Sequence, residues 1–475
     1  MRKFILSNIT IGLAIILMFT CFGCTPYNKT SSTTVSTDTT PHTPEDSSPE
    51  PEEIYIPEHQ TITILCNNTT RSFIQYLADC FMRRNEDTTV KLINIESSDS
   101  AEYTNELTEM LENGTAPDIV LLCNTRLTQN DVTLLKSDYF ADINKINDKY
   151  RYIDWQDYET NIIDAGILNG ERKFLPIFYE VPMLLGVKEH LDQSGVIYGN
   201  GASFTEFVNS LASRDGLTFK YPIFAYSMYK HLGLDMIDQW NSTVDFEDPK
   251  FRTFIEGYNA LFPDIYKGAS FTHSANTSNA LINNEILFFN SHTSQYSLYI
   301  TNLSNYYYDI IDEGKTPVLT TIPNLEGSDD VAGSLGWCLS INADTECEEA
   351  ALRLIKYATS LYYVDELEAF KGIPVNKKYN DAVKARYYRQ EAEFPETVDG
   401  YDYNDIFRIK VMDKEFLDSY YNILSRVTIH NYNDIEALSY IDLICVDITV
   451  NELSTDEAIQ KNENMLKQQL YSGHD

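Results

Sequence analysis

One stretch of this sequence decides its fold. It contains three short runs that are rich in β-branched and aliphatic residues: TITILC at residues 61–66, VKLINI at residues 90–95 and PDIVLL at residues 117–122. Runs of this length and composition favour β-strands. We therefore expect three strands in the first quarter of the chain.

Helical patterns separate these runs. In residues 71–84, Phe73, Leu77 and Phe81 recur at a spacing of four and form one apolar helical face. A second helical pattern ends at Asn113-Gly114. The order strand, helix, strand, helix, strand predicts an α/β fold with a mainly parallel sheet whose faces are covered by helices.

Polar residues follow two of the predicted strands. Asn67 comes directly after the first run, and Asn124 follows the third. Ligands of parallel α/β sheets bind beyond the carboxyl ends of the strands, so both residues are candidate ligand contacts. The alternative is that they only form turns, in which Asn is common.

The first 24 residues have the pattern of a secretory signal. Arg2-Lys3 precedes a mostly apolar stretch at residues 4–22, and Cys24 follows a glycine. A cysteine directly after the expected cut resembles the lipobox of bacterial lipoproteins. We predict a lipoprotein signal peptide at residues 1–23 and a lipid on Cys24. The alternatives are a plain transmembrane anchor and ordinary secretion.

Residues 24–58 differ from the rest of the chain in composition. After Cys24 they are rich in Ser, Thr, Pro and acidic residues and have almost no large apolar side chains. A segment of this kind cannot bury enough apolar surface to fold. We expect a disordered tether.

The charge of the chain argues against one class of partner. Its 475 residues include 36 Lys and Arg against 71 Asp and Glu, a formal net charge of −35. Such a chain repels phosphate backbones, so we expect no nucleic acid as a partner.

Metal and catalytic motifs are missing from the sequence. The six cysteines beyond Cys24 have no metal-ligand spacing, and small buried thiols are favoured over disulfides; they are Cys66, Cys80, Cys123, Cys338, Cys347 and Cys445. Residues 399–405 hold three carboxylates, which could bind calcium, but they lack the EF-hand order and a solvated loop is favoured. The sequence has no H-E-x-x-H, G-x-S-x-G or P-loop pattern. We therefore predict no cofactor, no metal site and no catalytic residue.

Six segments, in order, resemble motifs of the bacterial extracellular solute-binding proteins that serve ABC importers. They are PDIV at 117–120, YFADI at 139–143, NGERKFLP at 169–176, DFEDPKF at 245–251, GWCLSI at 336–341 with EEAA at 348–351, and LSTDEA at 453–458. The segments span most of the chain behind the lipobox and the tether. Residues 180–235 and 380–435 resemble the family least. Within one motif, Thr345 and Glu348 also predict a capping box.

The resemblance is to family 1, the sugar-binding type, and it implies a two-lobe α/β fold of the periplasmic-binding-protein type II. Each lobe would be a mainly parallel sheet flanked by helices, with the ligand in the cleft between the lobes. The order of the motifs places lobe 1 at 59–177 and 321–362, and lobe 2 at 178–320 and 363–475. The chain would cross between the lobes near Pro176 and near Ile322-Pro323. Closure on a ligand would then be a hinge motion.

The family also implies ligand contacts just after the crossings and at further strand ends. Besides Asn67 and Asn124, the candidates are Phe178, Tyr179, Glu180, Trp240, Asn290, Ser291 and Trp337. Aromatic rings suit the apolar faces of sugars, and amides and carboxylates suit their hydroxyls. For Trp240, packing in the core is the favoured interpretation.

Taken together, the sequence predicts a lipid-anchored protein on the outer face of the cytoplasmic membrane. It would capture a small solute, a carbohydrate or oligosaccharide, and deliver it to ABC transporter permease subunits formed by other chains. We expect a monomer. Two alternatives remain open: a surface sensor or receptor with the same fold and no transport role, and a lipid-anchored surface enzyme such as a glycosidase.

Overall fold

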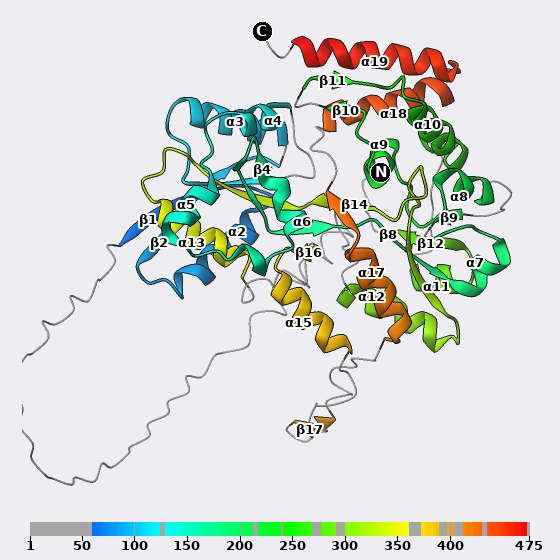
Figure 1. Ribbon diagram of the computed structural model, residues 1–475, viewed down its shortest axis with the longest axis horizontal. Helices are drawn as coiled ribbons and strands as arrows, with labels where there is room; N and C mark the ends of the chain where they lie inside the picture. Colours follow the sequence, from blue (N-terminus) through cyan, green and yellow to red (C-terminus); the bar gives the residue numbers. More distant parts are fainter. Residues whose placement is uncertain are drawn as a thin grey trace, which may run out of the picture. The chain divides into compact units, whose positions relative to one another are not determined.

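The computed structural model is shown in Figure 1. It describes residues 59–98, 100–123, 129–199, 201–211, 217–238, 241–267, 277–290, 300–360, 372–388, 397–398, 401–402, 412–429 and 435–472. These residues belong to one unit, Pro57–Asp475. The predicted signal peptide, Cys24 and the predicted tether lie outside the described residues.

The first sheet has the strand order β2-β1-β3-β15-β6. Its strands are β1 (Gln60–Asn67), β2 (Thr88–Ile95), β3 (Ile119–Cys123), β6 (Leu175–Pro176) and β15 (Trp337–Ile341). The three strands predicted from the sequence are all present, and they pair in parallel. Two strands come from distant parts of the chain: β15 pairs with β3 in antiparallel orientation, and β6 pairs with β15 in antiparallel orientation, so that β6 runs in the same direction as β1, β2 and β3.

The second sheet has the order β13-β8-β12-β9. It consists of β8 (Met183–Val187), β9 (Leu217–Phe219), β12 (Ile286–Asn290) and β13 (Pro317–Thr321). Only β9 and β12 are parallel, whereas β8 pairs with both neighbours in antiparallel orientation. Both sheets are therefore mixed, because β15 in the first sheet and β8 in the second run against the other strands.

In chain order, strands of a third sheet come between strands of the first and second sheets. The third sheet has the order β16-β7-β14-β19 and consists of β7 (Phe178–Glu180), β14 (Val331–Leu335), β16 (Ile373–Pro374) and β19 (Val427–Ile429). Residues 175–187 pass through the first, third and second sheets in turn as β6, β7 and β8. Residues 317–341 return through the same three sheets as β13, β14 and β15.

Helices surround these sheets, as Figure 1 shows. Those from the first part of the chain, together with α13, are α2 (Arg71–Met82), α3 (Ser100–Glu112), α4 (Gln129–Lys136), α5 (Ile143–Tyr150), α6 (Thr160–Ile163) and α13 (Glu348–Ala358). The others are α7 (Lys188–Ser194), α8 (Phe204–Leu211), α9 (Ala225–His231), α10 (Pro249–Leu261), α11 (Thr277–Ile282), α12 (Ile300–Asp312), α15 (Lys377–Tyr388), α17 (Lys414–Leu424), α18 (Ile435–Thr449) and α19 (Thr455–Ser472).

Short elements complete the described chain. They are the 3-10 turns η2 (Trp155–Asp157), η3 (Asp164–Gly166) and η4 (Ile265–Lys267), and the two-stranded pairs β4–β5 (Ile167–Leu168 and Glu171–Arg172), β10–β11 (Ile237–Asp238 and Thr243–Val244) and β17–β18 (Thr397–Val398 and Tyr401–Asp402). β18 is the described part of the loop for which calcium binding was weighed, and the rest of that loop lies outside the described residues.

Two hydrophobic clusters stabilise the fold. One extends from the first sheet through Phe178 and Leu335 to α12 and α17, where Tyr307 and Phe416 belong to it. The other joins β12 to α8, α9, α10, α18 and α19. The first cluster therefore packs residues of the first and third sheets together with helices from the C-terminal half of the chain.

Polar contacts explain several of the sequence motifs. Asp248 caps α10 by accepting the backbone N–H of Lys250, and Pro249 occupies the first turn, where its missing N–H costs nothing. Ser454 and Glu457 form a capping box at the start of α19.

The capping box predicted at Thr345 and Glu348 is wrong. The Thr345 hydroxyl donates to Asp118 at 2.6 Å instead, and Cys347 occupies the cap position of α13. Asp118 also accepts the backbone N–H and the hydroxyl of Thr63 at 2.7 Å each. This carboxylate holds three segments together, and a contact between distant segments has displaced the local one.

The described thiols agree with the prediction of buried cysteines. Cys66, Cys80, Cys338 and Cys445 are free and buried, and Cys347 is free and half-buried.

Candidate functional site

The carboxyl ends of the parallel strands of the first sheet lie at one edge. β1 ends at Asn67 and β3 at Cys123, and antiparallel β15 begins at Trp337 directly opposite Cys123. Trp337 therefore lies at the edge where α/β sheets bind ligands. We call this edge, with its counterpart in the second sheet, the strand-end site.

Three aromatic rings meet at this edge. Trp337 lies 4.4 Å from Phe73 and 5.7 Å from Phe178 between ring centroids, with edge-to-face angles of 63° in both pairs. Trp337 is 7% exposed and Phe178 is 4% exposed, whereas Phe73, at the start of α2, is half-buried. Edge-to-face packing of this kind adds to the stability of burial. Phe73 was not among the predicted site residues. Its position on the first turn of α2, directly after β1 ends, could have indicated that it lies at this edge.

Asn67 stabilises the turn between β1 and α2. Its side-chain oxygen accepts the backbone N–H groups of Thr69 and Thr70 at 3.1 and 3.0 Å and the Thr70 hydroxyl at 3.0 Å. The residue is 8% exposed. These contacts are those expected of an Asn turn, the alternative weighed from the sequence.

The second sheet has a matching edge. β9 and β12 are parallel and end at Phe219 and Asn290. The Asn290 amide accepts the backbone N–H of Tyr221 and donates to the Tyr221 carbonyl, both at 3.1 Å. Asn290 is 5% exposed, and because its amide bonds to the Tyr221 backbone it positions the segment after β9.

That segment places aromatic rings at the surface that sequence reasoning missed. Phe224 is 40% exposed and stacks on the half-buried Tyr226, with centroids 6.2 Å apart and an angle of 14°. Tyr221 is also half-buried. The signal was available in the sequence, because KYPIFAY at residues 220–226 brings aromatics and a proline directly after a β-prone run.

The third sheet holds Tyr179 and Glu180 next to Phe178 on β7. Tyr179 is buried, and burial together with the charge of Glu159 raises its pKa. Glu180 is half-buried and pairs with Ser334 across β7 and β14. Burial lowers the pKa of Lys230, and the charge of Glu180 opposes that shift. Glu180 and Lys230 therefore interact electrostatically at this sheet.

The predicted residues separate into three groups. Asn67, Phe178, Tyr179, Asn290 and Trp337 are buried, and Glu180 keeps partial exposure. Asn124, Trp240 and Ser291 lie outside the described residues.

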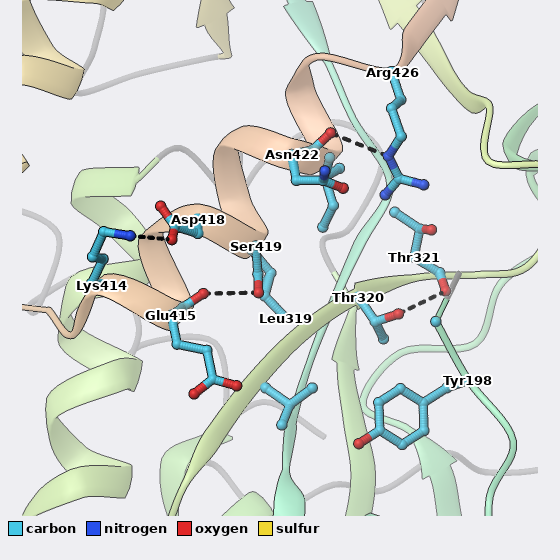
Figure 2. Close-up of a pocket in the computed structure, with 13 residues that line it drawn as sticks. Tyr198, Leu319, Thr320, Thr321, Lys414, Glu415, Asp418, Ser419, Asn422 and Arg426 are labelled. Carbon is cyan, nitrogen blue, oxygen red and sulfur yellow. Dashed lines mark hydrogen bonds and ion pairs between the residues drawn. The ribbon is translucent and has the colours of Figure 1, made fainter. Parts of the chain in front are cut away.

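A hollow of about 770 Å³ lies away from these residues. Figure 2 shows its wall: α17 on one side, β13 below it, and Tyr198 across the strand from the helix. Its lining residues are Tyr198, Gly199, Val318–Thr321, Lys414, Glu415, Asp418, Ser419, Asn422, Ile423 and Arg426. None of them was predicted as a site residue.

Two negative findings apply to the described part of the chain. It contains no helix long and apolar enough to cross a membrane. It also contains no group of three or more His, Cys, Asp or Glu side chains placed to hold a metal ion.

Comparison with known proteins identifies the family. The profile of the bacterial extracellular solute-binding proteins matches residues 77–395, which is more than half of the chain. The chain therefore belongs to this family. No curated protein sequence matches it.

Solved structures agree on the fold. The sugar-binding protein MalE from Xanthomonas citri aligns with a TM-score of 0.61 at 16% identity, over 87% of this chain and 98% of that one. The ABC substrate-binding protein Lmo0181 from Listeria monocytogenes, in complex with cycloalternan, aligns with a TM-score of 0.53 at 13% identity, over 87% and 99%. These likenesses confirm the two-lobe α/β fold class.

A de novo designed cysteine esterase also aligns, with a TM-score of 0.60 at 13% identity, over 88% of this chain and 100% of that one. Likeness at this level of identity shows the fold and decides no activity.

Proposed function

We propose that this protein captures a carbohydrate or oligosaccharide outside the cytoplasm. The observation that carries the proposal is membership of the solute-binding family, combined with aromatic and amide groups at the carboxyl ends of two sheets and the carboxylate of Glu180 on the third sheet. MalE is a sugar-binding protein, and Lmo0181 binds cycloalternan. The groups at the strand ends are those that sugar sites use.

Direct contacts to the solute come from the exposed groups at the strand-end site and from Glu180 of the third sheet. Glu180 and Phe224 keep exposed surface, and Phe73 and Tyr221 are half-buried. Trp337 packs between Phe73 and Phe178, Tyr179 is buried in the third sheet, and Asn67 and Asn290 hold the flanking turns. The proposed contacts at Asn124, Trp240 and Ser291 rest on the sequence alone.

The solute binds between two lobes that close by a hinge. The two passages of the chain through the third sheet, at residues 175–187 and 317–341, are the proposed hinge. Lobe 1 is proposed as residues 59–177 and 321–362, and lobe 2 as residues 178–320 and 363–475.

The protein hands its solute to an ABC permease. A lipid on Cys24 and the tether of residues 24–58 keep the binding unit at the outer face of the cytoplasmic membrane. Tethering raises the effective concentration of the binder near the transporter. The protein works as a monomer without catalysis.

Calorimetry on the mature protein, carrying Cys24→Ser so that no lipid is attached, tests the binding proposal against a broad panel of neutral sugars. At least one sugar is expected to bind, and Phe224→Ala and Glu180→Gln should each weaken it about tenfold, the equivalent of about 1.4 kcal/mol. Tyr76→Ala, which removes an exposed aromatic on α2, is the matched control and should leave binding unchanged.

Binding of no sugar by a folded protein would contradict the proposal. Unchanged uptake of the bound sugar after deletion of the protein would favour a sensor over a transport role. Turnover of the bound sugar by pure protein would indicate an enzyme.

A further inference from the structure

The hollow of Figure 2 is lined by residues different from those of the strand-end site, although Thr320 of β13 is level with Asn290 across β8. It lies along β13, the edge strand of the second sheet, and is covered on its other side by α17. It contains none of the strand-end residues. Its residues come mainly from 180–235 and 380–435, the two stretches that resemble the family least.

The chemistry of its wall suits a neutral ligand with many hydroxyl groups. Glu415, Ser419 and Asn422 are one turn apart and present a carboxylate, a hydroxyl and an amide on one face of α17. Across β13, Tyr198 offers a half-buried ring. A volume of about 770 Å³ falls within the range of small-molecule sites.

The charges of the wall are balanced. Lys414 pairs with Asp418 at 3.0 Å, and Arg426 donates to the Asp329 carbonyl at 2.7 Å and to the Asn422 carbonyl at 3.2 Å. Hydrogen bonds from Tyr388 and Lys414 lower the pKa of Asp418, so its carboxylate stays ionised at neutral pH. An anionic ligand would have to compete with these partners for Lys414 and Arg426, whereas a neutral one would not.

Two groups of the wall are available for hydrogen bonds. Within the described residues, the Glu415 carboxylate and the Asn422 side-chain amide make no hydrogen bond. Together they offer acceptors and a donor along about two turns of the helix, and the hydroxyl groups of a sugar can both donate and accept.

The wall is also held in place at both ends. At the start of α17, Asp413 accepts from the Tyr307 hydroxyl at 2.7 Å and donates its backbone N–H back to it at 2.9 Å. At the far end, the Arg426 carbonyl accepts the backbone N–H of Val331, and the Val427 carbonyl accepts from Asn161 of α6 at 2.8 Å. A wall fixed in this way loses little entropy when a ligand binds.

We propose that this hollow is a second binding site, distinct from the strand-end site, and that it takes a neutral sugar unit. The ring of the sugar packs against Tyr198, and its hydroxyls bond to Glu415, Ser419 and Asn422.

Hydrogen exchange measured along the chain tests the proposal, because it reports each site separately. The full mature protein with Cys24→Ser is exposed to maltose, maltotriose, trehalose and raffinose in turn. At least one sugar is expected to slow exchange in residues 414–424 and 317–321 by about fivefold or more. Ser419→Trp fills the hollow and should abolish that protection. Ser425→Trp adds the same ring at the C-cap residue of α17, which does not line the hollow, and should leave the protection intact.

A second variant guards against misfolding of Ser419→Trp. Asn422→Ala removes one exposed amide and keeps the backbone carbonyl that Arg426 uses. The variant should need about ten times more sugar for the same protection of α17, the equivalent of about 1.4 kcal/mol in binding free energy.

The outcomes separate this proposal from the proposed function. Protection of residues 219–226 alone, with α17 unaffected by every sugar, would overturn the second site and leave the proposed function standing. Protection of α17 alone would support the second site and count against sugar binding at the strand ends. Protection at neither place would overturn both, and protection of α17 that survives Ser419→Trp would overturn the second site.

Discussion

Phe178 occupies space that two glycines leave open. A Cβ atom on Gly336 would lie 2.1 Å from the Phe178 ring, and one on Gly372 would lie 2.4 Å from it. These distances are far shorter than any real contact of a Cβ atom. The ring can therefore reach Trp337 only because both positions lack a side chain.

Gly336→Ala should displace Phe178 and loosen its contact with Trp337. Overpacking of a core costs about 1–3 kcal/mol, so the free energy of unfolding in urea should fall by about that amount. Phe178→Leu in the same protein makes room for the added methyl group and should recover part of the loss. If Gly336→Ala lowers the free energy of unfolding by the same amount in wild type and in the Phe178→Leu variant, the glycine has a role other than making room for Phe178.

Asn290 is a second residue whose neighbours define its role. Asn290→Ala would remove the two hydrogen bonds that the Asn290 amide makes to the backbone N–H and carbonyl of the half-buried Tyr221. We expect a loss of about 1–3 kcal/mol in the free energy of unfolding and weaker sugar binding, because the segment carrying Phe224 is no longer held. The control is Asn241→Ala, whose amide bonds Asp238 at the surface and should matter little. No difference between the two variants would contradict the assignment.

At the scale of elements, one ion pair joins α13 to the turn before β2. Arg353 donates to both oxygens of Asp87 at 2.7 and 2.9 Å, and to Asn85 at 2.6 Å. The side chains of Arg353 and Asp87 are 19% and 21% exposed. The hydrogen bonds from Arg353, the largest cause, lower the pKa of Asp87 against the opposing effect of burial.

This pair should make stability depend on pH in one direction. The pKa of Asp87 is lower in the folded state than in the unfolded state, so its contribution is complete above the unfolded value of about 3.9 and is lost as pH falls through the folded value. Asp87→Asn should cost about 1–3 kcal/mol at neutral pH, and the difference from wild type should shrink below about pH 4. Urea unfolding at several pH values measures both.

The matched control for this ion pair is Asp381→Asn, which removes an exposed carboxylate paired with Lys377 within one helix. Such a pair contributes little, so the control should stay near wild type at all pH values. A constant gap between Asp87→Asn and wild type down to acid pH would show that the charge of Asp87 is not the cause.

At the scale of the whole molecule, the connections between sheets matter most. Residues 175–187 and residues 317–341 each pass through three sheets in sequence. Since the third sheet is joined to both others by continuous chain, a change in its strand geometry would move the two larger sheets relative to one another.

Sugar binding is therefore expected to make the protein more compact in solution. Small-angle scattering should give a smaller radius of gyration with saturating sugar than without, and Phe224→Ala should need more sugar for the same change. Binding seen by calorimetry without any change in radius would contradict hinge closure and leave binding itself intact.

Much of this fold could be predicted from local patterns. The runs at 61–66, 90–95 and 117–122 became β1, β2 and β3, and the apolar face of 71–84 became α2. These elements follow from side-chain periodicity, which each segment carries by itself. Strands β15 and β6 could not be placed in this way, because their partners lie far away in the sequence.

The site shows where local patterns stop. Trp337, Phe178 and Asn290 were predicted from the resemblance to the family together with their positions after a turn, a lobe crossing and a strand, and the structure places Trp337 and Asn290 at strand ends. Their burial, and the exposure of Phe224, depend on which distant segments cover them. The hollow is assembled from residues near 198, 320 and 420, which no sequence window brings together.

The sequence by itself determined the elements, the α/β class and the family, because periodicity, turn residues and the order of motifs are local properties of the chain. Only the tertiary structure decided which polar groups are already used and which remain available to a ligand. The amide of Asn67 is used by its own turn, whereas that of Asn422 has no partner in the described chain. The physical reason is that exposure and hydrogen bonding depend on packing between segments hundreds of residues apart, which no local pattern encodes.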